Sequence, residues 1–329
     1  TFRLRFPNKF LQGIQNNNVS GEYITHSKNV CDSYLIRDSE NLRYVQYSQV
    51  PSSKDCYDSS VIGCNAEQIF ESVTCGWGAS NIKFSWECWE SAQNMEYCIY
   101  CTISSDLFGC VGVQKKQYCI LNKQYEKSEF EKMRARVIDH MNKMPYVDTK
   151  GKVYAYGEFF PSEVSPLAYT YSIAPDHFPL TKDEVIAQGF RWTDPNPAEY
   201  QTTEDTKDIP DAIEEVSADI LKEIIKCEKC NRAYRIIEPE LQFLKHVGIP
   251  APRWCIDCRH NYRISQRNRA VFYDRICQCA GSVSENGVYK NSAVHLHNKD
   301  MCHNEFTTSY APNRPEIVYC EVCYNAEVA

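Results

Sequence analysis

The 329-residue sequence contains no uninterrupted run of 18 apolar residues. Because a helix needs about 20 such residues to cross a bilayer, no transmembrane helix is predicted and no membrane partner is expected. The first ten residues, TFRLRFPNKF, lack the apolar core of a secretory signal peptide. They also lack an initiating Met, so we expect that further residues precede them.

Cysteine, by contrast, is abundant. Of 18 cysteines, nine lie between Cys31 and Cys119 and nine between Cys227 and Cys323. A secreted disulfide scaffold is one interpretation of this content. The C-terminal pairs fit zinc better, and zinc thiolates require a reducing compartment. In the absence of a signal sequence, the cytoplasm is the predicted location.

The clearest motif consists of two Cys-x-x-Cys pairs. Cys227 and Cys230 form the first pair, and 24 residues separate it from Cys255 and Cys258. Each turn of this kind directs two sulfurs at one ion, so the two pairs complete a tetrahedral zinc site with no open position. A thiol-redox pair is the alternative, but no βαβ pattern surrounds either pair.

Local signals around these pairs predict how the segment folds. A short strand is expected at 233–237, and a helix from Pro239 that ends at Gly248. A second helix, from Cys255 to about residue 266, would place its thiolates at a helix N-terminus, which stabilises them. This order predicts a treble-clef or zinc-ribbon module, and a helix starting at Pro210 leads into it.

A second group of ligand-type residues ends in the half-site Cys320-x-x-Cys323. The residues that could complete it are Cys277, Cys279, His297 and Cys302. Nine cysteines after residue 226 therefore predict two zinc ions in the C-terminal module. Residues 295–304 could instead form a catalytic His-Asn-His metal site, as in a nuclease, but their order and spacing do not match a ββα-metal motif.

Arginine is concentrated beside the first predicted zinc site. Residues 249–275 carry six Arg and two Asp. Three of these arginines, Arg259, Arg263 and Arg267, recur at every fourth position and are predicted to share one face of a helix, with Arg269 close by. Guanidinium groups on a rigid helix suit nucleic-acid phosphates, so RNA or the ribosome is a predicted partner.

An acidic segment provides the alternative explanation for this arginine face. Residues 145–226 have a net charge of −9, and acidic residues are dense at 204–223. The arginines could pair with that stretch inside the molecule, or they could simply be solvated.

An internal repeat with a period near 25 residues is predicted between residues 27 and 124. Its copies begin near Asn29, Asp55, Asn81 and Asp106, and each contains two short strand-like pieces. Short strands at a fixed period are typical of a parallel β-solenoid, in which the cysteines would point inward as small apolar residues. An ordinary β-sandwich is the alternative.

Two helices are predicted after the repeat. A capping box at Ser128 and Glu131 begins the first, and Pro145 ends it; we expect this helix to cap the solenoid. A second capping box at Thr181 and Glu184 begins a shorter helix within an aromatic-rich connector.

The predicted fold class is mixed β and α+β. It comprises a Cys-rich β-solenoid at 1–124, a capping helix and connector at 125–209, and a C-terminal zinc-binding module at 210–329. Seven motifs stand out along the chain, at 109–112, 118–125, 157–161, 255–259, 286–291, 309–312 and 318–323. On these motifs the chain resembles an uncharacterised family of zinc-ribbon proteins from candidate-phyla bacteria (Patescibacteria). This resemblance covers nearly the whole chain and implies zinc binding, but no activity.

The leading functional prediction is a non-enzymatic zinc protein that binds nucleic acid. A protein-interaction scaffold is the main alternative, because solenoids offer long faces and many zinc ribbons bind proteins. Enzymes are less favoured. Besides the nuclease, the other enzyme class is a carbohydrate-active solenoid, which usually shows a carboxylate or basic cluster on one face. Glu87, Glu90 and Asp106 do not form a convincing cluster, whereas Asp55, Asp58 and Glu71 leave that class open.

Overall fold

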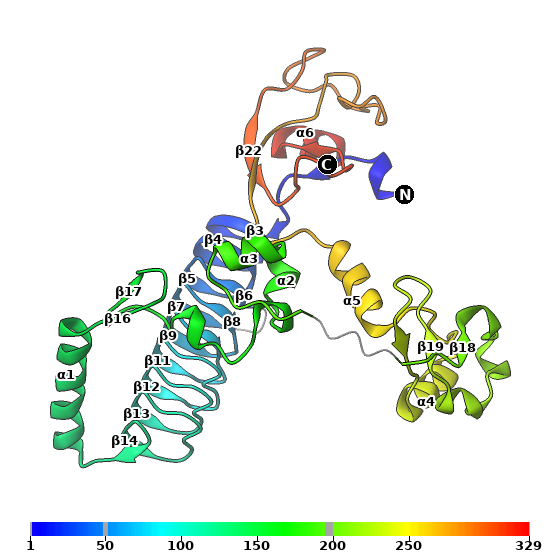
Figure 1. Cartoon of the computed structure of the whole chain (residues 1–329). Helices are drawn as coiled ribbons and strands as arrows, with labels where there is room; N and C mark the ends of the chain where they lie inside the picture. The colour runs from blue at the N-terminus through cyan, green and yellow to red at the C-terminus, as the bar shows by residue number, and fades with distance from the viewer. Residues whose placement is uncertain (1, 49–51, 195–199, 329) are drawn as a thin grey trace. The chain divides into compact units, whose positions relative to one another are not determined.

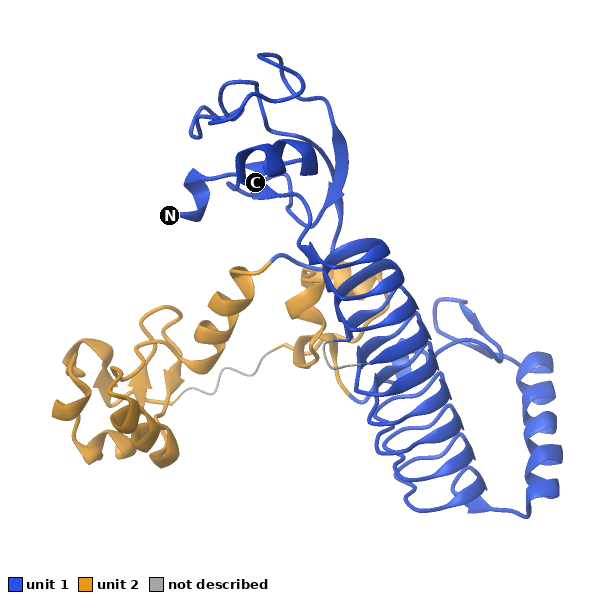
Figure 2. Cartoon of the chain, turned by 180° about the vertical axis from the view of Figure 1, so that it is seen from behind, with its two compact units in different colours: residues 1–166, 268–329 blue, residues 167–267 orange. Residues whose placement is uncertain are grey.

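The computed structural model describes residues 2–48, 52–194 and 200–328. The chain divides into two compact units, one of residues 1–166 with 268–329 and the other of residues 167–267 (Figure 2). The chain thus leaves the first unit and later returns to it. The predicted C-terminal module at 210–329 is accordingly split between the units at residue 268.

The predicted parallel β-solenoid is confirmed, with about eight turns (Figure 1). One ladder of parallel strands runs through β3, β4, β5, β7, β9, β11, β12, β13 and β14, and a second through β4, β6, β8 and β10. Their bounds are β3 Asn17–Thr25, β4 Lys28–Arg37, β5 Glu40–Arg43, β6 Gln46–Ser48, β7 Ser53–Tyr57, β8 Ser60–Ile62, β9 Ala66–Phe70, β10 Val73–Cys75, β11 Ser80–Lys83, β12 Gln93–Glu96, β13 Ser105–Phe108 and β14 Gln117–Ile120. The ladder ends in β15, Lys123–Gln124, which pairs antiparallel with β14.

Each coil is about half as long as the predicted repeat. One column of buried side chains, whose members lie 12 to 14 residues apart, is Val30, Leu42, Cys56, Ile69, Ile82, Met95, Leu107 and Cys119. Asn29, Asp55, Asn81 and Asp106 therefore begin alternate coils. The two strand-like pieces of each predicted repeat stack on each other in neighbouring coils, which is why a period near 25 residues is wrong.

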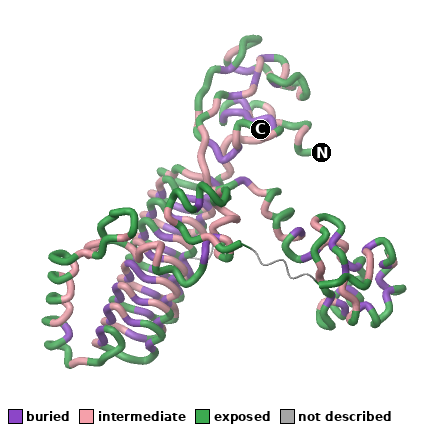
Figure 3. The backbone as a smooth tube through the Cα atoms, viewed as in Figure 1, coloured by how far each residue is buried: buried purple, intermediate pink, exposed green. Residues whose placement is uncertain are grey.

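The backbone of each coil turns about every three residues. About every third residue has a positive φ, and the residue after it points inward. In the coil of residues 28–39 the turning residues are Asn29, Asp32, Leu35 and Asp38, and the inward residues are Val30, Ser33, Ile36 and Ser39. Asn and Asp tolerate this left-handed conformation better than other non-glycine residues, so they are frequent at the turns. Figure 3 shows the resulting buried positions recurring along the coils.

Hydrogen-bonded side-chain ladders connect the coils. Asn94 accepts a hydrogen bond from the Asn81 amide at 2.8 Å and donates one to Asp106 at 3.0 Å. An equivalent ladder joins Asn18, Asn29, Asn41 and Asp55. Inside the coils, the hydroxyl of Ser72 accepts from the backbone of Ser85, whose own hydroxyl accepts from the backbone of Cys98. These bonds satisfy polar groups that the narrow interior excludes from water.

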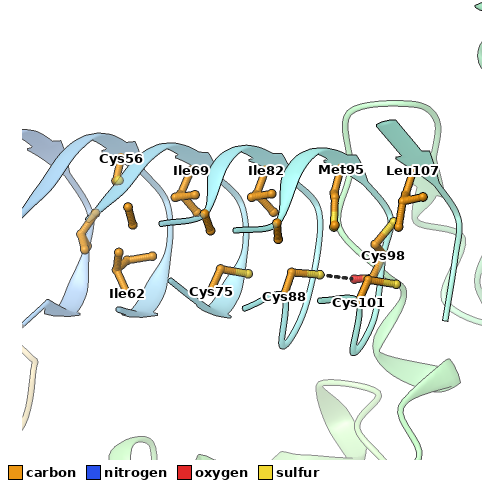
Figure 4. Packing of buried hydrophobic residues seen from close by; sticks show 14 of the residues in the cluster. Cys56, Ile62, Ile69, Cys75, Ile82, Cys88, Met95, Cys98, Cys101 and Leu107 are labelled. Atoms are coloured by element: carbon orange, nitrogen blue, oxygen red, sulfur yellow. Dashed lines mark hydrogen bonds between the residues drawn. The ribbon is translucent and has the colours of Figure 1, made fainter. Parts of the chain in front are cut away.

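Most N-terminal cysteines line this interior, as predicted. Seven of the nine are buried, while Cys31 and Cys64 are partly exposed. Cys75, Cys88 and Cys101 stack in successive coils, and the Cys88 thiol donates to the carbonyl of Cys98 at 3.7 Å (Figure 4). Burial raises the pKa of Cys56 to about 11, as expected for a thiol that cannot ionise in an apolar core.

Helix α1, Lys127–Lys143, follows the last coil. It begins one residue before the predicted capping box, and its N-cap Glu126 makes no side-chain capping bond. Phe130 is buried against Phe108 and Ile120, while Arg134 reaches Glu96 in β12. The helix therefore contacts the flank of several final coils. A hairpin of β16, Tyr146–Val147, and β17, Val153–Tyr154, follows.

The second unit begins with two short helices, α2 at Ala174–His177 and α3 at Lys182–Ala187. The predicted capping box of Thr181 and Glu184 is confirmed. The helix predicted from Pro210 is wrong: the chain forms separate 3-10 turns at Ile213–Glu215 and Ala218–Lys222. Their apolar residues still enter a core with Leu241 and Leu244 of α4, Glu238–Val247. No helix within the described ranges has the length and apolar character needed to cross a bilayer.

Candidate metal centres

The first centre brings together the four predicted thiols of Cys227, Cys230, Cys255 and Cys258, whose sulfur atoms all lie within 4.8 Å of one another. Cys227 directly follows β19, Ile225–Lys226, which pairs antiparallel with β20, Ala233–Tyr234. Three of the four cysteines are buried. Four thiols that converge in this way could hold one metal ion.

Two helices explain the position of the second thiol pair, Cys255 and Cys258. Helix α4, Glu238–Val247, ends at Gly248, whose φ of 68° allows the chain to turn back. Cys255 is the N-cap of α5, Ile256–Ser265, and its backbone N–H donates to the Cys227 sulfur at 3.2 Å. The amides at the start of a helix stabilise thiolates.

Hydrogen-bond donors around the first centre favour a thiolate at Cys230. Burial raises the pKa of Cys230, but hydrogen bonds from the backbone and side chain of Arg232 outweigh it and lower the pKa to about 6. Arg232 in turn forms an ion pair with Asp257 at 2.9 Å. A thiolate at neutral pH is the form that binds a metal ion.

The second centre gathers Cys277, Cys302, Cys320 and Cys323, all buried, with the same limit of 4.8 Å between ligand atoms. Strands β21, Tyr273–Ile276, and β22, Glu305–Thr308, form a hairpin, and Cys277 follows its first strand. Cys320 follows β23, Val318–Tyr319, and Cys323 lies in α6, Glu321–Val328. This centre repeats the plan of the first, with one thiol pair beside a hairpin and the other beside a helix start.

The N-terminal segment contributes to the support of this second centre. Strand β1, Asn8–Lys9, pairs in parallel with β23, and the Thr308 hydroxyl donates to the carbonyl of Phe10 at 2.6 Å. The first residues of the chain thus pack on the C-terminal module, although the sequence placed them in the solenoid domain. The short β2, Gly13–Ile14, then pairs with the first coil.

A third group consists of Cys279, His295, His297 and, again, Cys323. The Nδ1 atom of His295 lies 3.2 Å from the Cys279 sulfur, and Nε2 of His297 lies 3.2 Å from the Cys323 sulfur. Three ligand groups thus occur among the described residues, where the sequence predicted two. Cys277 and Cys302 complete one C-terminal group, while Cys279 and His297 belong to the other.

The sequence pattern indicated His295 only within the alternative metal site at 295–304, and it did not indicate Glu327 as the partner of His295. The His-x-His spacing at 295 and 297 was a usable signal, because alternate residues in an extended segment can turn toward one site. Glu327 lies 32 residues further along the chain and reaches His295 only in the folded protein. No local sequence pattern therefore indicated it.

The predicted arginine face is only partly realised. Arg259 lies on α5 but forms an ion pair with Glu240 of α4 at 3.0 Å, and Arg263 is exposed. Arg267 lies beyond the C-cap of α5. Burial lowers the pKa of His177, and the charge of Arg267 lowers it further. Arg269 falls in the other compact unit, so the four arginines do not form one helical face.

The acidic segment pairs with a different arginine. Arg253, which precedes the second thiol pair, donates to the carbonyls of Thr206 and Ile209 and forms an ion pair with Asp211. The acidic segment thus contacts Arg253, whereas Arg259 pairs with Glu240, so the predicted pairing of this segment with the arginine face is not what the structure shows.

Comparison of the chain with models of known protein families gives no match, and comparison with curated proteins gives none either.

Proposed function

We propose that the chain is a zinc-binding protein whose metal ions are structural. The three ligand groups contain only thiol and imidazole donors, the set that favours zinc over magnesium or calcium. Each group supplies four protein ligands, so a tetrahedral ion held there has no open position for a substrate. This closure argues against the alternative of a metal-dependent nuclease. Zinc content of the purified, reduced chain tests the proposal, and a folded metal-free chain contradicts it.

We further propose that the region around the first centre binds single-stranded nucleic acid, with RNA as the preferred class. A lysine ammonium group that lies over two aromatic rings supports this proposal. Lys229 Nζ lies 4.7 Å from the ring centre of Trp254 and 6.0 Å from that of Tyr262. Tyr262 is 50% exposed, and Arg263 beside it is also exposed. Exposed rings can stack on unpaired bases while the cations meet phosphates.

This surface is rigid for local reasons. Trp254 immediately precedes Cys255, Tyr262 lies on α5, and their rings meet edge to face at 5.6 Å. Lys229 lies between the two cysteines of the first pair. A bound metal ion would hold all three elements in place, so little ordering would accompany the binding of a strand.

Binding of a labelled, unstructured RNA across a salt series tests this function. The variant Lys229→Gln/Arg263→Gln should weaken binding and reduce the slope of log affinity against log salt by about 1.4, or about 0.7 per phosphate contact. The matched control Lys222→Gln/Lys245→Gln removes two exposed charges from the same unit and should change the slope less. Equal slopes in both variants would contradict the proposed surface.

One observation favours the scaffold alternative as a second candidate. A groove of about 730 Å³ on the solenoid is lined by residues that include Tyr47, Val61, Trp77 and Trp89. Trp77 is 57% exposed and lies edge to face with Trp89 at 6.1 Å. An exposed apolar surface of this kind is typical of interaction sites. Crosslinking of the unaltered chain and of Trp77→Ser tests this function. Proteins that crosslink to the unaltered chain but not to the variant would support it, and the same set of proteins in both would oppose it.

We also propose a fold for the first centre, a related family and a cellular location. Residues 227–265 would form a treble clef, supported by a second thiol pair at a helix N-terminus. The resemblance to Patescibacterial zinc-ribbon proteins is consistent with the thiol groups. A reducing cytoplasm would suit so many free cysteines.

A further inference from the structure

Two of the three ligand groups share one residue. Cys323 belongs both to the group with Cys277, Cys302 and Cys320 and to the group with Cys279, His295 and His297. Its side chain is buried at the start of α6, between the two groups. The two groups together contain seven side chains, whereas two tetrahedral ions need eight ligand positions. One side chain would therefore have to serve both ions.

The two histidines are oriented as metal ligands. His295 turns Nδ1 toward the Cys279 sulfur, while its Nε2 lies 2.8 Å from the carboxylate of Glu327. His297 turns Nε2 toward Cys323, while its Nδ1 lies 2.6 Å from the carbonyl of Asp300. In metal sites the nitrogen that does not bind the ion donates to a carboxylate or carbonyl in this way. Both rings satisfy that pattern independently.

The sulfur atoms are also supplied with hydrogen-bond donors. The Asn291 amide donates to Cys279 at 3.2 Å and the Asn304 amide to Cys320 at 3.4 Å. The backbone N–H of Cys320 donates to Cys277 at 3.2 Å. Five thiolates carry one more negative charge than two divalent ions neutralise. Hydrogen bonds donated to the sulfur atoms stabilise this excess negative charge.

We propose that the thiolate of Cys323 bridges two zinc ions in a dinuclear centre. Cys277, Cys302 and Cys320 would complete one ion, and Cys279, His295 and His297 the other. With zinc–sulfur bonds of about 2.3 Å, the two ions would lie no more than about 4.6 Å apart. The proposal rests on the proposed zinc binding and adds that two of the three ions share a ligand.

The first centre provides an internal control, because Cys227, Cys230, Cys255 and Cys258 share no ligand with another group. Intact-chain mass spectrometry under native conditions should count three zinc ions. Cys230→Ala and His297→Ala should each lose one ion, whereas Cys323→Ala should lose two. A loss of one ion from Cys323→Ala would overturn the bridge.

A measurement on the unaltered chain avoids dependence on variants that fail to fold. After exchange of zinc for ¹¹³Cd²⁺, three cadmium resonances should appear, and two should split each other through the shared sulfur. The third, from the first centre, should remain a singlet. Three uncoupled resonances would overturn the bridge and leave zinc binding intact. No bound metal in the reduced, folded chain would overturn zinc binding itself.

Discussion

The imidazole of His295 and the carboxylate of Glu327 meet at 2.8 Å with side-chain exposures of 1% and 0%. Glu327 also accepts hydrogen bonds from the backbone N–H groups of Ser292 and Ala293 and from the hydroxyl of Tyr289. Burial raises the pKa of Glu327, but the hydrogen bonds from Ser292, His295 and the backbone of Ala293 outweigh it and lower the pKa to about 2. The end of α6 thus fixes the loop that presents both histidines.

Replacing Glu327 with Gln should weaken zinc binding at the histidine-containing group. The amide keeps the shape but removes the charge that orients the imidazole, and the loss of such a partner typically lowers metal affinity 10- to 100-fold. Competition with a chelator should release one ion earlier than in the unaltered chain. Glu321→Gln on the same helix, which removes only an exposed ion pair with Lys9, should leave the release unchanged.

Asn94 should contribute to solenoid stability in two separable ways. Asn94→Ala removes two ladder hydrogen bonds and places a less tolerant residue at a φ of 50°, so we expect a loss of about 2–3 kcal/mol. Asn94→Gly removes the same bonds without the conformational penalty and should cost less. Urea unfolding measures both. Equal losses would show that the left-handed conformation adds nothing, and the exposed neighbour Gln93→Ala should have little effect.

Cys56 should make the solenoid sensitive to alkali. Because burial raises its folded pKa from 9.0 to about 11, the neutral thiol stabilises the fold below pH 9, and this contribution is lost as pH rises toward 11. Two pKa units correspond to a maximum of about 3 kcal/mol. Cys56→Ala should therefore reduce the fall in unfolding free energy over that interval. A curve parallel to that of the unaltered chain would contradict this role; Cys64→Ala, at a partly exposed site, is the control.

Arg253 should hold the acidic segment onto the module of the first centre. Arg253→Ala removes its hydrogen bonds to the carbonyls of Thr206 and Ile209 and its ion pair with Asp211. We expect limited proteolysis to cut residues 204–211 several-fold faster. Arg263→Ala should leave that rate unchanged, because its exposed side chain has no ion pair with the segment among the described residues. Equal protection in both variants would show that other contacts hold the segment.

Local spacing was enough to predict the first metal centre, because both halves of that site are short turns. The turn between Cys227 and Cys230 and the helix start at Cys255 each bring two sulfurs together within a few residues. The sequence likewise predicted the solenoid, whose inward cysteines and turning Asn and Asp residues follow from short-range backbone geometry. The predicted coil length was wrong because each predicted repeat joined two neighbouring coils, whose strand-like pieces stack on each other.

Only the tertiary structure decided how the remaining ligands divide. Cys279, His295 and Cys323 come from separate segments, and their grouping depends on the pairing of β1 with β23 and on the place of α6. The arginines show the same limit, since helical spacing predicts a shared face but not where the helix ends or which carboxylate Arg259 meets. Spacing determines contacts within one turn or helix, whereas contacts across dozens of residues depend on the packing of the whole unit.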